Sequence, residues 1–213
     1  MDYNELINNM DKFTTGTTTV GIRCVDGVIL ATDRRATAGY LIANRNAQKI
    51  YILDEHMAAT IAGTVADAQN IMDVITAEAK LYKIRSGKPI PVKAASRLLS
   101  NILFQSRMLP YILQLIIGGV DEAGPSLFVL DLFGSLTEEK FISTGSGSPI
   151  ALGVLEDRYF DNIDVDSAIR LAIQAVNSAI NRDIGSGDGV DVIKITDTGV
   201  TKLSQEEIDK YVS

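Results

Sequence analysis

The sequence predicts one α+β domain in which helices cover the outer faces of two stacked β-sheets. Three observations predict this class. Short β-type segments come first, two long segments with a helical period follow, and β-type and helical segments then share the rest of the chain. Strands and helices grouped in separate runs are typical of α+β proteins. Stacking two sheets with helices outside would bury every apolar face, and no linker rich in Pro, Gly or Ser divides the chain.

The composition is that of a soluble globular protein, with 46% hydrophobic and 22% charged residues. A net charge of −7 without a basic run argues against a nucleic-acid partner. No apolar run reaches the ~18 residues of a membrane span, and the polar, acidic start does not resemble a secretory signal. We therefore expect a cytoplasmic protein without a membrane partner. The single cysteine, Cys24, excludes an internal disulfide and is expected to be a small buried residue.

The β-type segments of the first part begin with a hairpin whose turn is Asp26-Gly27, a strong hairpin signal. Residues 34–47 and 54–56 interrupt the apolar pattern and are expected to be connections. The predicted strands are Thr18 to Cys24, Val28 to Asp33, Gln48 to Leu53 and Met57 to Ala62.

A change of period after these strands predicts two consecutive helices, which we expect to be antiparallel neighbours. Thr64 to Asp67 matches a capping box, and Gly87 with Pro89 ends the first helix. Pro91 can open the second, which stops before Pro110. The expected inward positions are Val65, Ala68, Met72, Ile75, Ala79 and Tyr82 in the first helix, and Ala95, Leu98, Leu99, Ile102 and Leu103 in the second.

The second half is expected to complete the sheets and the outer helices. Asp164 is the predicted N-cap of a long helix, and Ser204 to Glu207 is a capping box for a short C-terminal one. The remaining predicted elements are strands Ile112 to Val120 and Leu127 to Leu132, a loop from Gly145 to Pro149, a short helix near Ile150 to Asp157, and strands at Val190 to Thr196 and near Val200.

The run KFTTGTTTVGIRC, from Lys12 to Cys24, crowds threonines around Gly16. A threonine hydroxyl needs a neighbouring base to act as a nucleophile. The only histidine, His56, lies in a predicted turn, which favours a structural role. A threonine at a chain terminus would carry its own base, because the pKa of an α-amino group is near ~8. Cutting between Gly16 and Thr17 would create that terminus, although threonine also suits an ordinary strand entry.

Separated motifs decide between these two interpretations. TTTVGI is followed in order by ATDRRAT, QKIY, TIAGTVADAQ, STGSGSP and NRDIGSGDGVDV. This series resembles the catalytic β subunits of archaeal proteasomes, which are N-terminal-nucleophile hydrolases, from Thr17 to the C-terminus. The resemblance implies a four-layer α-β-β-α sandwich of two antiparallel sheets. It also implies a propeptide of residues 1–16, removed by autocleavage, and a hydrolase domain of residues 17–213.

The resemblance implies a threonine endopeptidase with Thr17 as nucleophile, Asp33 and Lys49 as its charged partners, and Gly63 N–H in the oxyanion hole. A lysine ammonium near Thr17 favours loss of the hydroxyl proton, and a carboxylate holds the lysine charged. The supporting residues implied around the terminal amine are Ser146, Asp183 and Ser186. Thr37 and Gly63 are expected to pair with the substrate backbone. The implied pocket positions are Ala36, Ala47, Tyr51, Ile61 and Val65, mostly small or apolar, so we expect cleavage after hydrophobic residues.

The same resemblance implies the partners. They are α subunits and other β subunits in stacked seven-membered rings, an ATPase regulatory ring, and unfolded polypeptide substrates. It implies no cofactor and no metal. Two alternatives remain open at this point: a different N-terminal-nucleophile amidase, which would hydrolyse small amides instead of peptides, and an inactive structural β-type subunit, whose ring would tolerate loss of Lys49.

Overall fold

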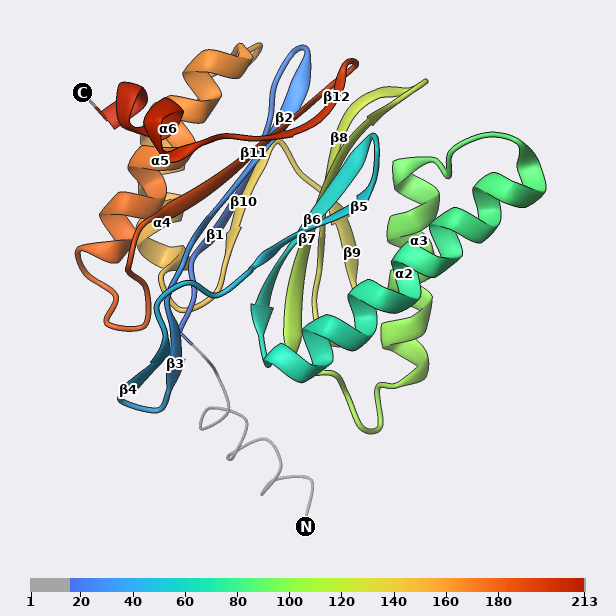
Figure 1. Cartoon of the computed structure of the whole chain (residues 1–213), viewed down its shortest axis with the longest axis horizontal. Helices are drawn as coiled ribbons and strands as arrows, with labels where there is room; N and C mark the ends of the chain where they lie inside the picture. The colour runs from blue at the N-terminus through green and yellow to red at the C-terminus, as the bar shows by residue number, and fades with distance from the viewer. Residues whose placement is uncertain (1–15, 213) are drawn as a thin grey trace.

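A computed structural model describes residues 16–212 of the chain. It contains two five-stranded antiparallel sheets and a separate two-stranded ribbon, with helices outside (Figure 1). The first sheet has the order β10 (Phe141–Thr144), β1 (Thr19–Arg23), β2 (Gly27–Asp33), β11 (Val190–Thr196) and β12 (Gly199–Lys202). The second has the order β5 (Ile50–Asp54), β6 (Met57–Gly63), β7 (Leu113–Asp121), β8 (Gly124–Leu130) and β9 (Leu136–Glu138).

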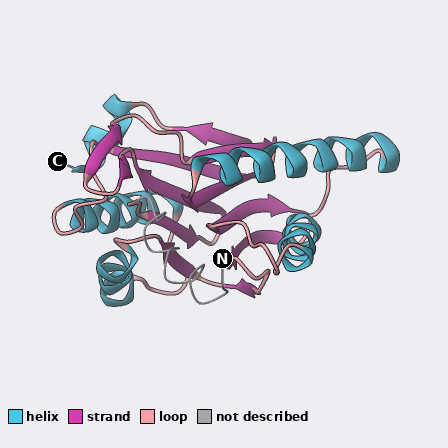
Figure 2. Ribbon diagram, turned by 90° about the horizontal axis from the view of Figure 1, so that it is seen from below, coloured by secondary structure: helices cyan, strands magenta, loops and turns pink. Residues whose placement is uncertain are grey.

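The helices lie in two groups on opposite outer sides, with the strands between them (Figure 2). One group covers the first sheet and consists of α4 (Ser148–Arg158), α5 (Val165–Ile180) and α6 (Gln205–Val212). The other covers the second sheet and consists of α2 (Val65–Ser86) and α3 (Val92–Gln105). The predicted four-layer α-β-β-α sandwich is confirmed.

Alternation along single strands explains why four layers form. In β2, Ile29 and Ala31 face the helices of the first sheet, while Val28 and Leu30 enter the core between the two sheets. Side chains of a strand alternate between its two faces, so a strand that is apolar at every position must be covered on both sides. β2 is buried throughout its length, as the middle position in such a sandwich requires.

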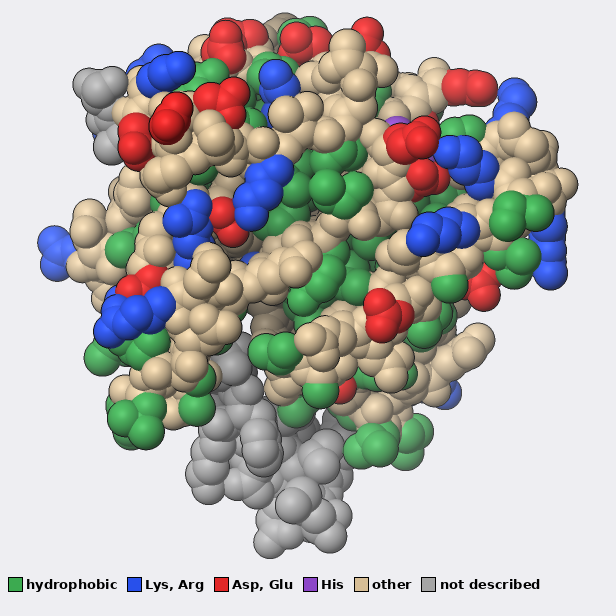
Figure 3. Space-filling view, in the orientation of Figure 1, with side chains coloured by type: hydrophobic (Ala, Val, Ile, Leu, Met, Phe, Trp, Pro, Cys, Tyr) green, Lys and Arg blue, Asp and Glu red, His purple; other side chains and the backbone are tan. Residues whose placement is uncertain are grey.

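Positive and negative side chains are mixed on the face that Figure 3 shows, in agreement with a sequence that has no basic run. Figure 3 shows Lys and Arg interspersed with Asp and Glu over the face seen in Figure 1, and hydrophobic side chains along the middle, between the two halves. Within the described chain, no helix is both long enough and apolar enough to cross a membrane.

Most predicted boundaries agree with the structure. α2 ends at Gly87, whose N–H donates to the Lys83 carbonyl, and Asp164 caps α5 by accepting from Ser167 N–H. The C-terminal capping box also forms, because Ser204 N–H donates to the Glu207 carboxylate at 2.7 Å. Cys24 is buried, as expected.

Other predictions were wrong in detail. The loop predicted to reach Pro149 ends earlier, because α4 begins at Ser148. Residues 34–47 are not only a connection, because β3 (Ala36–Ala38) and β4 (Leu41–Asn44) form a ribbon there. The strand expected to run to Leu132 ends at Leu130, and β9 and β10 were not predicted. Val65 and Tyr82, expected to face inward on α2, are 54% and 40% exposed.

The capping box predicted at Thr64 does not form as such. The Asp67 carboxylate accepts from the Thr64 hydroxyl at 2.7 Å and from Ile112 N–H at 2.9 Å, instead of from the Thr64 backbone. Thr64 N–H donates to the Ile112 carbonyl. Asp67 therefore ties the start of α2 to the segment that enters β7, a partner that local sequence spacing does not reveal.

Candidate active site

Thr17 lies just before β1 and is 2% exposed. The antiparallel register of β1 and β2 pairs Thr19 with Thr32, which brings the start of β1 beside the end of β2. Thr18 N–H consequently donates to the Asp33 carboxylate at 2.9 Å. The hairpin predicted at Asp26-Gly27 is thus what places residue 17 next to residue 33.

Asp33 is fully buried and accepts four hydrogen bonds. Lys49 Nζ donates to Oδ1 at 2.6 Å, in addition to Thr18 N–H. Oδ2 accepts from the backbone N–H groups of Arg35 at 3.0 Å and Gly187 at 2.9 Å. Hydrogen bonds from donors of this kind compensate a buried carboxylate for the loss of water.

Lys49 directly precedes β5, so this ion pair joins the second sheet to the end of β2 in the first. The side chain is nearly buried, and burial lowers the pKa of Lys49 because it disfavours the charged form. The Asp33 carboxylate opposes this effect and favours the ammonium. The two residues are therefore electrostatically dependent on each other.

A second polar cluster contacts the backbone of Thr17. Ser146, in the loop before α4, accepts from Thr17 N–H at 3.1 Å. Its hydroxyl donates to Asp183 Oδ2 at 2.6 Å, and Ser186 donates to the same oxygen at 2.6 Å. The loop after α5 supplies Asp183 and Ser186. All five polar residues that the sequence suggested around Thr17 therefore belong to two connected hydrogen-bond clusters at its position.

Gly16 is the last residue before Thr17 and makes an unusually close backbone contact. A Cβ atom on Gly16 would lie 2.1 Å from the Cα of Gly185, so no other residue fits without moving the backbone. Gly16 N–H donates to the Thr37 hydroxyl at 2.8 Å. The Thr17 hydroxyl donates to the Gly16 carbonyl oxygen at 2.7 Å, which places it beside the peptide bond that joins residues 16 and 17.

A small pocket opens beside Thr17 and Lys49. Its lining contains all five pocket positions expected from the sequence together with Gly63, and adds Gln48 and Ala68, which were not expected. Gly63 has φ +146°, and a Cβ atom there would lie 2.2 Å from the Ile112 carbonyl oxygen. Only glycine fits this backbone position at the end of β6.

Several groups at the site were not identified from the sequence. Thr18 contacts both clusters, because its amide donates to Asp33 and its hydroxyl lies 2.7 Å from Ser186 Oγ. Gly147 N–H donates to the Thr17 carbonyl at 3.3 Å. A backbone N–H donor cannot be recognised from residue type. Thr18 was not recognised because threonine is common in strands. The glycines of GSGDG at 185–189 were the available indication of close backbone approach.

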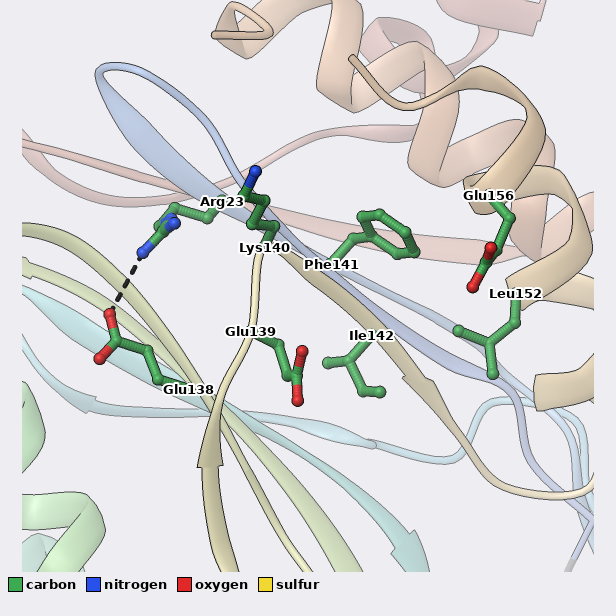
Figure 4. A pocket seen from close by; sticks show the side chains of 8 residues that line it. All are labelled: Arg23, Glu138, Glu139, Lys140, Phe141, Ile142, Leu152 and Glu156. Carbon is green, nitrogen blue, oxygen red and sulfur yellow. Dashed lines mark hydrogen bonds and ion pairs between the residues drawn. The ribbon is translucent and has the colours of Figure 1, made fainter. Parts of the chain in front are cut away.

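A larger pocket lies away from Thr17 (Figure 4). It includes Phe141, Leu152 and the Arg23–Glu138 ion pair at 3.2 Å. In the β1–β10 register Ile22 pairs with Phe141, whereas Thr19 pairs with Thr144 near the other end. The pocket of Figure 4 therefore lies at the opposite end of these strands from the candidate nucleophile.

His56 does not take part in either cluster around Thr17. It lies between β5 and β6, and its Nε2 is 2.9 Å from the Ile90 carbonyl oxygen. Within residues 16–212, no group of three or more His, Cys, Asp or Glu side chains is arranged to hold a metal ion. The polar groups described around Thr17 are hydroxyls, carboxylates, one ammonium and backbone N–H groups.

Comparison with known proteins identifies the family. The model of the proteasome subunit family matches residues 13–195. The chain belongs to the proteasome subunit family.

Its relatives include archaeal proteins named proteasome subunit beta. The one from Archaeoglobus profundus is 53% identical over 95% of this chain and 95% of its own length. The one from Methanothermobacter thermautotrophicus is 52% identical over 92% of this chain and 94% of its own length. The one from Methanospirillum hungatei is 56% identical over 91% of this chain and 93% of its own length. The expectation of a proteasome core β subunit, drawn from the motifs, is confirmed, and proteasome membership supports a role in proteolysis.

Proposed function

We propose that this proteasome subunit is a threonine endopeptidase, made as a precursor and activated by cleavage of its own Gly16–Thr17 bond. One observation carries the proposal: separate chain segments bring three charged residues, Asp33, Lys49 and Asp183, and the two serines Ser146 and Ser186 to a single threonine. In its amide-linked form, Thr17 has no free amine. Residues 1–16 are in this account a propeptide, and residues 17–213 the mature domain.

Activation begins with attack of Thr17 Oγ1 on the Gly16 carbonyl carbon. The Thr17 hydroxyl lies 2.7 Å from the oxygen of that carbonyl, and Gly16 carries no side chain to obstruct it. The hydroxyl loses its proton as it attacks. As the C–N bond breaks, the Gly16 acyl group forms an ester with Thr17 Oγ1, and the departing nitrogen takes up the proton that the hydroxyl lost. Water then hydrolyses the ester, which releases residues 1–16 and leaves a free α-amine on Thr17.

Substrate cleavage uses the same hydroxyl with the new amine as general base. An α-amine has a pKa near ~8, so a useful fraction is neutral at neutral pH. Thr17 Oγ1 attacks the substrate carbonyl, the amine takes the hydroxyl proton and delivers it to the leaving amine, and an acyl-enzyme ester forms. The amine then activates water, which hydrolyses the ester. The Lys49 ammonium, held by Asp33, favours loss of the hydroxyl proton.

The surroundings of the pocket provide the remaining groups. Gly63 precedes α2, so its N–H lies near the positive end of the helix dipole, which favours a developing oxyanion. Removal of Gly16 leaves Thr37 on the path that an extended substrate would follow. The pocket wall combines Ala36, Ala47 and Ile61 with a partly buried Tyr51, which favours cleavage after hydrophobic residues.

In this proposal the subunit works in seven-membered β rings stacked between α rings in the cytoplasm, fed with unfolded chains by an ATPase ring. Enclosure explains the propeptide, because an amine blocked until assembly keeps a free subunit from digesting other proteins. No metal or cofactor takes part in the proposed chemistry.

The test compares Thr17→Ala with Thr17→Ser in particles assembled with the α subunit. We expect Thr17→Ala to assemble, to keep residues 1–16 and to hydrolyse a fluorogenic hydrophobic peptide at under about 1% of the wild-type rate, because the nucleophile is absent. Thr17→Ser retains a hydroxyl and should retain processing and measurable hydrolysis. Active Thr17→Ala particles would refute the proposal.

A further inference from the structure

Thr18 is the residue that joins the two polar clusters of the site. It is fully buried. Its backbone N–H donates to the same Asp33 oxygen that accepts from Lys49, at 2.9 Å and 2.6 Å respectively. Its hydroxyl lies 2.7 Å from Ser186 Oγ, in the cluster around the Thr17 nitrogen. One residue thus contacts the lysine side and the amine side of the nucleophile.

The direction of each hydrogen bond follows from the carboxylate of Asp183. An ionised carboxylate can only accept, and a serine hydroxyl has one proton to give. Ser186 lies 2.6 Å from Asp183 Oδ2 and gives its proton there. The hydrogen bond between Thr18 and Ser186 must therefore be donated by Thr18.

The same reasoning fixes the bond to the Thr17 nitrogen. Ser146 lies 2.6 Å from Asp183 Oδ2 and 3.3 Å from the Thr17 carbonyl oxygen, so its proton goes to the nearer, charged acceptor. Ser146 Oγ then accepts from Thr17 N–H at 3.1 Å. The result is a continuous series in which Thr18 and Thr17 donate to two serines, and both serines donate to one carboxylate oxygen.

The packing around Thr18 also favours a specific role for its hydroxyl. A Cβ atom on Gly147 would lie 2.0 Å from Thr18 Oγ1, so the loop before α4 leaves space that the hydroxyl uses. Ser186, its acceptor, is 1% exposed and cannot readily replace the lost donor with bulk water. Removing the Thr18 hydroxyl therefore leaves a buried acceptor unsatisfied inside the cluster.

We infer that Thr18 is a positioning residue for catalysis, which rests on the function proposed for Thr17. Its hydroxyl holds Ser186, and through Asp183 and Ser146 it sets the position of the Thr17 nitrogen, which is the general base after cleavage. A misplacement of about 1 Å at a catalytic group costs on the order of 10²-fold in rate. Thr18 therefore affects turnover and not the substrate pocket, whose lining does not include it.

The neighbouring Thr19 offers a matched control. It is also fully buried, and its hydroxyl lies 2.7 Å from another hydroxyl, that of Thr144, on the β1–β10 pair. Thr19→Val and Thr18→Val each remove one buried hydroxyl from adjacent residues. Only Thr18→Val removes a group bonded to the catalytic cluster, so loss of stability alone would affect both variants similarly.

The experiment measures kcat and KM for a hydrophobic peptide in particles assembled with the α subunit, normalised to the fraction of β chains that begin at Thr17. We expect Thr18→Val to lower kcat by about 10- to 100-fold with KM changed less than about 3-fold, and Thr18→Ser to stay within about 3-fold of wild type. Thr19→Val should also stay within about 3-fold. If Thr18→Val does not assemble, Thr18→Ala takes its place and must show the same loss relative to Thr18→Ser.

Equal activities of Thr18→Val and Thr19→Val, or a Thr18→Ser variant no better than Thr18→Val, would overturn the inference. Thr17→Ala particles are measured in the same experiment. They distinguish this failure from failure of the proposed function. If Thr17→Ala is inactive while Thr18→Val is fully active, only the role of Thr18 is wrong. If Thr17→Ala is active, the proposed function itself is wrong.

Discussion

The Lys49 ammonium lies 2.6 Å from the Asp33 carboxylate, and the two side chains are 7% and 0% exposed. Asp33 ends β2 in the first sheet, and Lys49 precedes β5 in the second. The pair is therefore a buried link between the two sheets as well as a part of the candidate active site. Its two functions, in stability and in chemistry, can be separated by substitution.

Substitution of Lys49 tests its part in the chemistry. Lys49→Ala should lower peptide hydrolysis by about 10²-fold or more and slow removal of residues 1–16, because the positive charge that favours loss of the Thr17 proton is gone. The measurement is the hydrolysis rate of assembled particles together with the intact mass of the β chain. Lys140→Ala is the control, since Lys140 pairs with Asp161 on the surface and should leave both readouts unchanged. Full activity of Lys49→Ala particles would contradict the role assigned to Lys49.

Substitution of Asp33 tests the mutual dependence of the pair. Asp33→Asn keeps the shape but leaves a buried lysine without its counter-ion, which should destabilise the fold by about 3–5 kcal/mol. Asp33→Asn with Lys49→Met removes both charges and should recover most of that stability but no activity. Thermal unfolding and peptide hydrolysis of the same samples check this. A double variant as unstable as Asp33→Asn alone would contradict it.

The lowered pKa of Lys49 gives the pair a pH dependence with a definite sign. The unfolded chain holds the lysine proton up to about pH 10.5, while the folded chain releases it at a lower pH, mainly because of burial. Between those two values the unfolded state binds more protons, so this group makes stability rise with pH. Across the alkaline range, the thermal midpoint of wild type should therefore rise relative to that of Lys49→Met as the pH increases. Parallel curves would contradict it.

The backbone at Gly63 provides a third test. Gly63→Ala would place a Cβ atom 2.2 Å from the Ile112 carbonyl oxygen at a φ of +146°, so the peptide must move. We expect a loss of about 10²- to 10³-fold in kcat, the effect of losing one oxyanion donor. Gly153→Ala is the matched control, because Gly153 is exposed within α4 and has no atom near its Cβ position, and should add about 0.5–1 kcal/mol of stability. Normal turnover by Gly63→Ala would contradict the assignment.

Cys24 should be chemically inert in the folded chain. Burial, with smaller contributions from Asp26 and Asp164, raises the pKa of its thiol to about 12. At pH 8 the reactive thiolate is then about 10³-fold scarcer than for an ordinary cysteine. Iodoacetamide should label the chain slowly when folded and rapidly in guanidinium chloride, as followed by mass. Equal rates would contradict the burial of Cys24.

The parts of the fold that follow local rules were predictable from sequence. Gly87 and Asp164 mark helix ends because their effects lie within one turn of the chain. The β3–β4 ribbon was missed because its four-residue strand β4 is wholly exposed and shows no apolar alternation. Asp67 was assigned to a capping box from local spacing alone. Its hydrogen bond from Ile112 N–H joins elements that are distant in sequence, so local spacing could not reveal it.

The site residues also divide into those that sequence motifs indicate and those that only distant contacts in the fold reveal. Thr17, Asp33 and Lys49 were found through motifs whose residue types carry chemistry. Thr18 was considered only a strand residue, because nothing in TTTV distinguishes one threonine from the next. Its role depends on the loop at 183–187 reaching it from the far end of the chain, which only the folded structure shows.

The intact mass of the β chain in purified, active particles tests the central claim most directly. We expect a mass equal to that of residues 17–213, with threonine as the first residue, and the full-length mass in inactive Thr17→Ala particles. Active particles whose β chains all keep residues 1–16 would contradict it, because Thr17 would then have no free amine to act as a base.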